Sequence, residues 1–177
     1  MKKEFNPVCK INMTVMDDSE FLSPYSPVAE PVISGDVAEF LENGANKFLP
    51  KQSIELNVYS NCIDDDEKAV YDKAIRNYFN LKLEGIKLAL RRNLIVSVIF
   101  TVIGILGLAA MLLIDHFFGS AVWTEVVDIF AWVFVWEAVD QFFIERRKLL
   151  LERKKYQAFT ETKMNYYKAA SGKVNND

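Results

Sequence analysis

Two long apolar segments stand out in the pattern of hydrophobic and polar positions along the chain. The first, from Asn93 to Ile114, carries no charged side chain, and the second runs from about Val122 to Ile144. As a helix, each segment is about long enough to cross a hydrocarbon layer of roughly 30 Å. Because a backbone in lipid must satisfy its own hydrogen bonds, the pattern predicts two transmembrane helices, 93–114 and 122–144, joined as a hairpin. The alternative is a buried helical hairpin in the core of a soluble protein.

Basic residues mark one side of this hairpin. They are Lys82, Lys87, Arg91 and Arg92 before the first segment, and Arg146, Arg147, Lys148, Arg153, Lys154 and Lys155 after the second. No lysine or arginine lies between them. The positive-inside rule then predicts a two-span protein of a prokaryotic inner membrane with both termini in the cytoplasm. The residues expected at the lipid interfaces are Arg91, Arg92, Arg146 and Arg147 on the inner side and Trp123 on the outer side.

Before the hairpin, a period of two marks two strands. In Cys9–Val15 and in Ile54–Tyr59, apolar residues occupy every second position and therefore share one face. Such strands predict a sheet that is covered on one side and exposed to water on the other. A helix is expected from Asp36 to Gly44, because Asp36 and Glu39 have the spacing of a capping box and a glycine is a common helix end.

This N-terminal part, residues 1–63, is predicted to form a small α/β head. Two strands and one short helix bury little apolar area for about sixty residues, so a further element must complete the core. Three candidates remain open: the helix that follows, a strand from the proline-containing loop at 17–34, or a second copy of the chain.

The rest of the chain, residues 64–170, is predicted as a helical hairpin with a stalk. The acidic residues at 64–67 are interpreted as a helix start, because the spacing of a calcium-binding loop is absent. Apolar residues then recur every three or four positions, and no proline follows Pro50. One helix is therefore expected to continue into the first span, and another to run from 145 to 168. Residues 171–177 are expected to be a disordered tail.

The predicted fold class is thus a membrane α-helical hairpin with two transmembrane helices, long cytoplasmic helical extensions and a small N-terminal α/β head. Within the hairpin, GxxG at 104–107 is expected to allow close approach of two helices.

Of the acidic residues between Val122 and Ile144, Glu137 and Asp140 lie in the inner half of the second apolar segment. Glu137 and Asp140 are roughly 13 and 9 Å inside it, at about 1.5 Å per helical residue, and Ser97 and Thr101 reach matching depths in the first. A charge at membrane depth is costly, so it usually faces a partner, a cavity or a pore. Three interpretations of this polar seam remain open. The carboxyl groups hold helices together, or they line a cation path between several copies, or they pair with the arginines that precede the first span.

Composition and scattered polar residues argue against several function classes. The first 66 residues contain five basic and twelve acidic side chains, which disfavours nucleic acid as a partner. His116 is the only histidine and has no second ligand nearby, so no metal site and no catalytic base are expected. Cys9 and Cys62 are interpreted as ordinary thiols in a reducing compartment. No enzymatic activity and no cofactor are therefore expected.

The order of the predicted elements resembles that of calcium uniporter pore subunits. The signature of that family is a tryptophan, an acid, two residues and a second acid, and it is similar to the segment Trp136-Glu137-Ala138-Val139-Asp140. Here the motif lies in the inner half of the second span, and Gln141 stands where that family has proline. The segment 136–147, WEAVDQFFIERR, also resembles that of two-span membrane proteins of prokaryotes, which implies no particular activity.

The leading expectation is an interaction protein in contact with the lipid bilayer. Its cytoplasmic head would bind a protein partner or a small ligand, and its hairpin would anchor the chain and form a homo-oligomer. The alternative is a small homo-oligomeric cation channel or membrane effector with an acidic ring at Glu137 and Asp140.

Overall fold

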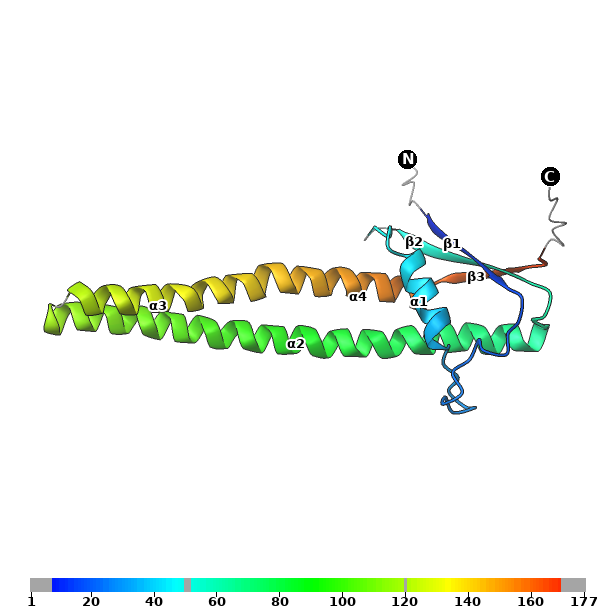
Figure 1. The fold of residues 1–177 in the computed structure, drawn as a ribbon, viewed down its shortest axis with the longest axis horizontal. Coiled ribbons are helices and arrows are strands. Elements are labelled where there is room, and N and C mark those ends of the chain that lie inside the picture. The colour runs from blue at the N-terminus through cyan, green and yellow to red at the C-terminus, as the bar shows by residue number, and fades with distance from the viewer. Residues whose placement is uncertain (1–7, 50–51, 120, 170–177) are drawn as a thin grey trace, which may run out of the picture. The chain divides into compact units, whose positions relative to one another are not determined.

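The computed structural model describes residues 8–49, 52–119 and 121–169, which are mostly helical with one small parallel sheet (Figure 1). The chain divides into two units. Residues 1–84 together with 154–177 form the first, and residues 85–153 form the second. We call the first unit the head and the second the hairpin. The head thus draws on both ends of the chain, whereas the sequence predicts it within residues 1–63.

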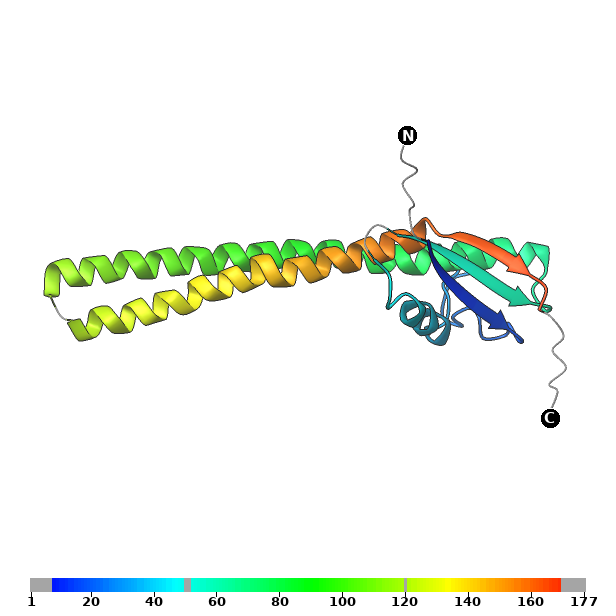
Figure 2. The ribbon, with the colours of Figure 1, turned by 90° about the horizontal axis from the view of Figure 1, so that it is seen from above.

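Three parallel strands form the sheet of the head, in the order β1-β2-β3 (Figure 2). Strands β1 (Val8–Val15) and β2 (Ser53–Ser60) confirm the two strands predicted from the period of two. Strand β3 (Lys163–Tyr167) lies where a helix to residue 168 is predicted, and that prediction is wrong.

The helix before β3, α4 (Arg146–Thr160), ends at a contact with Arg76 of α2 (Asp65–Phe118). The guanidinium of Arg76 donates to the carbonyl oxygens of Thr160, at 2.6 Å, and Thr162, at 3.1 Å. The carbonyl of Thr160 is one of those that a helix end leaves without a partner, and that of Thr162 belongs to the turn before β3. The residues that follow, KMNYY, alternate in polarity and pair with β2 instead.

Helices cover one face of the sheet, as α1 (Gly35–Gly44), the start of α2 and the end of α4 show in Figure 1. The helix α2 (Asp65–Phe118) contributes Tyr71, Ala74, Ile75 and Phe79 to the core. The ring of Phe159 from α4 stacks on Phe79 with 4.0 Å between centroids. Of the three candidates for completing the core, the helix that follows β2 in the chain, α2, is therefore confirmed. The elements α4 and β3 also complete the core, and neither is among those candidates.

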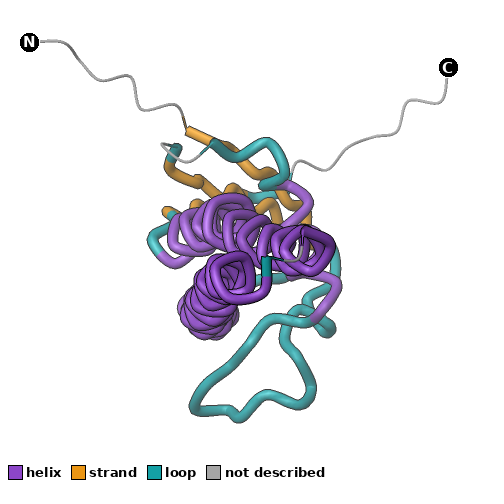
Figure 3. Tube along the Cα trace, turned by 90° about the vertical axis from the view of Figure 1, so that its left-hand side faces the viewer, coloured by secondary structure: helices purple, strands orange, loops and turns teal. Residues whose placement is uncertain are grey.

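The loop between β1 and α1 adds no strand to this sheet. Leu22 and Ile33 form a single antiparallel bridge within the loop. Figure 3 shows the loop on the other side of the helices from the strands. It is held to α2 by Lys73, which donates to the carbonyl of Ala29, and by Asn77, which donates to that of Pro31.

The other face of the sheet carries polar side chains in three rows, which confirms the predicted exposed face. One row is an asparagine ladder: Asn57 donates to Asn12 at 2.9 Å, and Asn165 donates to Asn57 at 3.1 Å. The flanking rows, from the strand register, are Lys10, Glu55 and Lys163 on one side and Thr14, Tyr59 and Tyr167 on the other. The ladder is unusual in burying its central amide, since Asn57 is 8% exposed.

The two helix starts differ in how they are capped. At α2, Asp64 accepts from the backbone of Glu67, and Glu67 accepts from the backbone of Asp64, both at 2.9 Å. This reciprocal box confirms that the acidic run begins a helix. At α1 (Gly35–Gly44), the N-cap is Ser34, so the capping box predicted at Asp36 is wrong, although the predicted end at Gly44 is confirmed.

The hairpin contains the rest of α2, then α3 (Ala121–Val139), the π-helix η1 (Asp140–Glu145) and the first half of α4. Within the described ranges, α2 is the one helix long and apolar enough to cross a membrane, judged by length and composition. Only 11% of its most apolar stretch is buried inside the chain. This stretch is therefore mostly exposed, unlike the start of α2, which packs in the core of the head.

Candidate functional sites

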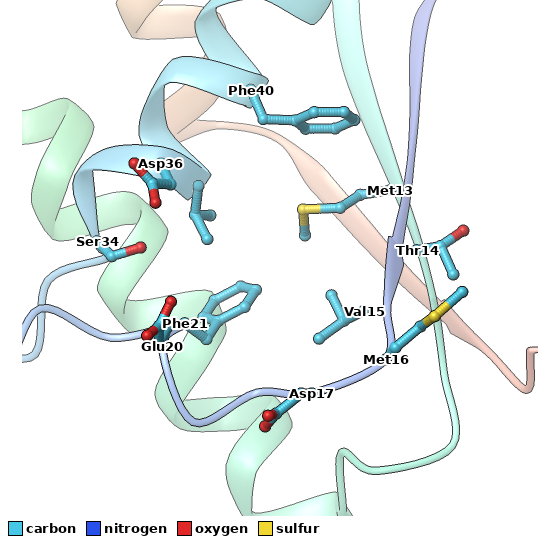
Figure 4. A pocket seen from close by; sticks show the side chains of 11 residues that line it. Met13, Thr14, Val15, Met16, Asp17, Glu20, Phe21, Ser34, Asp36 and Phe40 are labelled. Carbon is cyan, nitrogen blue, oxygen red and sulfur yellow. The ribbon is translucent and has the colours of Figure 1, made fainter.

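An open pocket of about 300 Å³ lies in the head where β1 ends (Figure 4). Its apolar lining consists of Met13 and Val15 from β1, Met16 and Phe21 from the loop, and Val37 and Phe40 from α1. Figure 4 shows Met13 and Val15 pointing from the strand towards the loop and helix. This direction follows from the alternation of side chains along a strand, which also buries both residues.

The loop wall of the pocket is fixed by Phe21 and its neighbours. Phe21 stacks on Tyr71 with 4.3 Å between centroids, and its carbonyl accepts from the backbone of Ser34 at 2.9 Å. The hydroxyl of Tyr71 in turn donates to Asp18 at 2.9 Å. Burial, together with this carboxylate, raises the pKa of the Tyr71 phenol. The loop is thus tied to the core next to the pocket.

Three carboxylates stand at the pocket, on Asp17, Glu20 and Asp36, and no basic residue lines it. The backbone N–H of Ser19 donates to Asp17 at 3.0 Å, which lowers the pKa of that carboxyl. Within the described part of the chain, neither Glu20 nor Asp36 forms an ion pair. The pocket therefore has a negative potential that favours a cationic ligand.

One polar group at the pocket has no partner. The Oγ of Ser34 is buried and makes no hydrogen bond with the described residues, although Ser34 is the N-cap of α1. A serine in this position usually accepts from a backbone N–H of the first turn. Leaving a buried hydroxyl unpaired costs about 1–3 kcal/mol.

In the hairpin, small residues let α2 and α3 approach closely. A Cβ added at Gly107 would lie 2.9 Å from the Cβ of Ala131, and one added at Gly104 would lie 2.8 Å from a methyl of Val135. Only a glycine fits at such distances. The close approach predicted from GxxG is confirmed, and small residues at such a contact are typical of helices that pack in membranes.

A polar contact lies further along the same pair of helices. The side-chain amide of Asn93 donates to the carbonyl oxygen of Gln141 at 2.9 Å and to its Oε1 at 3.0 Å. The carbonyl of Gln141 also accepts from the backbone of Arg146, five residues on, as in a π-helix. The wide turn of η1 therefore occurs where a side chain from α2 reaches the backbone.

Within the described ranges, no hydrogen bond joins Ser97 or Thr101 to Glu137 or Asp140 of the predicted polar seam. Ser97 is buried, and its hydroxyl donates to the carbonyl of Asn93 in its own helix at 2.9 Å. Thr101 donates in the same way to Ser97 at 2.8 Å. Glu137 is exposed and accepts from Gln141 of its own helix at 3.1 Å.

Glu137 and Asp140 instead share a shallow groove of about 600 Å³ on one face of α3 and η1. Its apolar lining consists of Ile129, Trp132, Val133 and Trp136. On a helical wheel this face lies opposite Ala131 and Ala138, the buried residues of α3. The acids therefore point away from α2.

The expected interface residues are all on helices and mostly exposed. Arg91, Arg92 and Arg147 are exposed, Trp123 is 64% exposed, and Arg146 lies over the ring of Phe142 at 5.7 Å. Among the ion pairs of the described ranges, none joins these arginines to Glu137 or Asp140.

Comparison of the chain with protein-family models, with curated proteins and with solved structures finds no match. Arguments about function therefore rest on the chain's own residues. Among the described residues, no group of three or more histidine, cysteine, aspartate or glutamate side chains is arranged to hold a metal ion.

The sequence analysis missed the pocket as a site. Met13 and Val15 are visible in the strand pattern, but Phe21 and Ser34 reach the pocket only because the loop returns to the end of β1. The available signal was local: the acids Glu20 and Asp36 lie next to the apolar residues Phe21 and Val37, near the two ends of the proline-containing loop.

Proposed function

We propose that the protein is an integral membrane protein that holds a ligand-binding head at the membrane and self-associates through its hairpin. The observation that supports this most is the continuity of α2. Its first residues, including Ala74 and Phe79, are core residues of the head, and the same unbroken helix contains the apolar segment 93–114. An unbroken helix transmits anchoring from one part to the other without a linker.

The proposal includes two spans and a cytoplasmic head. Its support is the sequence of the flanks, basic on both outer sides of the apolar pair, and the antiparallel contact of α2 with α3 through Gly104 and Gly107. The proposed binding site of the head is the pocket at the end of β1. Among the described residues, its carboxylates Glu20 and Asp36 form no ion pair and its Ser34 hydroxyl forms no hydrogen bond. No catalytic role is proposed for any of these groups.

Self-association is supported by the groove on α3. A face with Glu137 and Asp140 would be costly against hydrocarbon, whereas a second copy can cover it and share hydrogen bonds. This face, rather than the predicted seam with Ser97 and Thr101, is the proposed contact between copies.

A photo-crosslinking side chain at Phe40 tests the proposal in intact cells. The protein should stay in membranes after alkaline carbonate extraction, and a fraction should form an adduct that increases its mass. The matched control is Tyr25, 94% exposed on the loop and outside the pocket, which should give little adduct. Extraction by carbonate would exclude anchoring, and equal adducts at both positions would exclude the pocket as the site.

A second candidate is a cation channel formed by several copies. It is favoured by the same outward position of Glu137 and Asp140, since acids on a face between copies are able to attract cations. Glu137→Gln with Asp140→Asn should then abolish conductance in reconstituted bilayers and keep the oligomer. Glu125→Gln with Asp128→Asn makes the same charge change in the same helix and should conduct normally. If neither the wild type nor the control conducts, the contact role remains.

A further inference from the structure

The head has a free sheet edge beside its pocket. Strand β1 pairs with β2 only, and in the described ranges no strand lies along its other edge. An edge strand presents backbone N–H and C=O groups to solvent and is a template for an extended peptide. Peptides that add to such an edge gain affinity from the backbone and specificity from pockets for alternate side chains.

The pocket lies where such a specificity pocket would be needed. It is lined by Met13 and Val15, the residues of β1 that face the helices, and it opens at the end of that strand. Side chains at paired positions of neighbouring strands point to the same face. Every second side chain of an added strand would therefore be directed towards the helix side, where Phe40 and Phe21 form the walls.

The charges at the pocket define the side chain that fits. Glu20 and Asp36 form no ion pair with the described residues, and Asp17 adds a third carboxylate. The apolar walls match the methylene stem of a lysine or arginine, whose charged end would reach the acids. About 300 Å³ is at the lower end of ligand pockets and accommodates one long side chain.

The strands β1 and β3 of a second copy, as far as the structure describes them, do not offer such a side chain. The residues of β1 that face the helices are Cys9, Ile11, Met13 and Val15, and those of β3 are Met164 and Tyr166. None is basic, and most are occupied in the copy's own core. Charge complementarity therefore favours a different polypeptide.

We infer that the edge of β1 and the adjacent pocket bind an extended segment of another protein as a fourth strand, with one lysine or arginine side chain in the pocket. The inference rests on the proposed function, because it names the ligand of the head. Backbone pairing with β1 supplies affinity, and the carboxylates of Glu20 and Asp36 select the cation.

The test uses the full chain in lipid nanodiscs and a fluorescent seven-residue peptide of alternating threonine and valine with a central lysine. Fluorescence anisotropy should show saturable binding, and a peptide with central glutamate should bind at least about tenfold more weakly. Glu20→Gln with Asp36→Asn should weaken the lysine peptide about tenfold, since two partly exposed ion pairs are lost. Glu30→Gln with Glu39→Gln removes the same charge outside the pocket and should change affinity less than about twofold.

Backbone methylation tests the strand itself. N-methyl groups on alternate residues can be placed in two sets, and only the set whose N–H groups face β1 should abolish binding. Equal loss from both sets, equal binding of the glutamate peptide, or insensitivity to Glu20→Gln with Asp36→Asn would overturn the inference. Lysine amide binding as tightly as the peptide would also overturn it, in favour of a small organic cation. If the protein forms a dimer and the Asp36→Asn variant does not, the inference is overturned, and the occupant of the pocket is a second copy of this chain.

The results separate the inference from the proposed function. If an adduct forms at Phe40 in membranes but no lysine peptide binds, the inferred peptide ligand is wrong and the proposed anchored, ligand-binding head still holds. Absence of both the adduct and peptide binding would remove both.

Discussion

Two tyrosine hydroxyls of the head donate to carboxylates at the margin of the core. Tyr166 donates to Asp72 at 2.7 Å, and Tyr71 donates to Asp18 at 2.9 Å. Burial, and then the neighbouring carboxylate, raises the pKa of both phenols above the usual value. The fold therefore favours the protonated phenol in each case.

This preference predicts a loss of stability at alkaline pH. A raised folded pKa contributes stability that is fully present below the unfolded pKa of about 10 and is lost as pH rises through the folded value. Tyr166→Phe should lower stability at pH 7 by roughly 1–3 kcal/mol, through the lost hydrogen bond to Asp72, and should flatten the decline above pH 10. Tyr71 still titrates, so part of the decline remains.

Thermal unfolding in one detergent, followed by circular dichroism between pH 7 and 12, measures this effect. Tyr25→Phe is the control, because Tyr25 is 94% exposed and should leave both the midpoint and its pH dependence unchanged. Identical declines in wild type and Tyr166→Phe would contradict the assignment.

Single residues also show which contacts a sequence reveals. The alternation in β1 and β2 predicts the exposed face of the sheet, including Asn12 and Asn57. It does not predict that Asn165 completes a ladder with them, because that requires the register of a third strand. The pocket is similar: its strand residues are visible in the pattern, but Ser34 reaches it through the return of a loop.

At the scale of elements, the contact between α2 and α3 depends on two glycines. Gly107→Ala would place a Cβ 2.9 Å from that of Ala131, so the helices must separate, and overpacking of this kind costs roughly 1–3 kcal/mol. Gly85→Ala is a matched change in the same helix with nothing within 4 Å of the new Cβ. It should stabilise the helix by roughly 1 kcal/mol, because alanine is the better helix former.

Opposite shifts of the unfolding midpoint in the same detergent are therefore expected for the two variants. A Gly107→Ala protein as stable as Gly85→Ala would show that α2 and α3 do not pack through this surface.

The elements also differ in how far they can be predicted. Long periodic segments such as α2 are evident from the chain, and so are strands with four or more alternating positions. Strand β3 has five residues and is set by pairing with β2, about a hundred positions earlier, so local periodicity gave the wrong element. The π-helix η1 is set by a contact with Asn93 and has no local signature.

At the scale of the whole molecule, the head is built from two distant parts of the chain. Replacing residues 85–153 with eight glycine and serine residues should give a head that folds in water without detergent. The ends are near enough, because the rings of Phe79 and Tyr156 are 5.9 Å apart and such a linker spans about 14–17 Å.

A dispersed NMR spectrum of this shortened chain would confirm that the head is self-sufficient. Residues 1–84 alone are the control. They lack β3 and the ring of Phe159, so the sheet loses its third strand and the core loses a stacked aromatic pair. The NMR signals of residues 1–84 should therefore lose their dispersion. Equal dispersion from residues 1–84 would show that the C-terminal part is dispensable.

The position of β3 near the end of the chain also sets an order of events on the ribosome. Roughly 100 residues separate the end of β2 from the start of β3, which translation at about 5–20 residues per second adds in about 5–20 s. The apolar segments emerge within this interval, while the nascent head still lacks its last strand and the ring of Phe159. In the proposed membrane protein, insertion into the bilayer would therefore begin before the head closes, and a membrane-targeting factor would meet a partly folded chain.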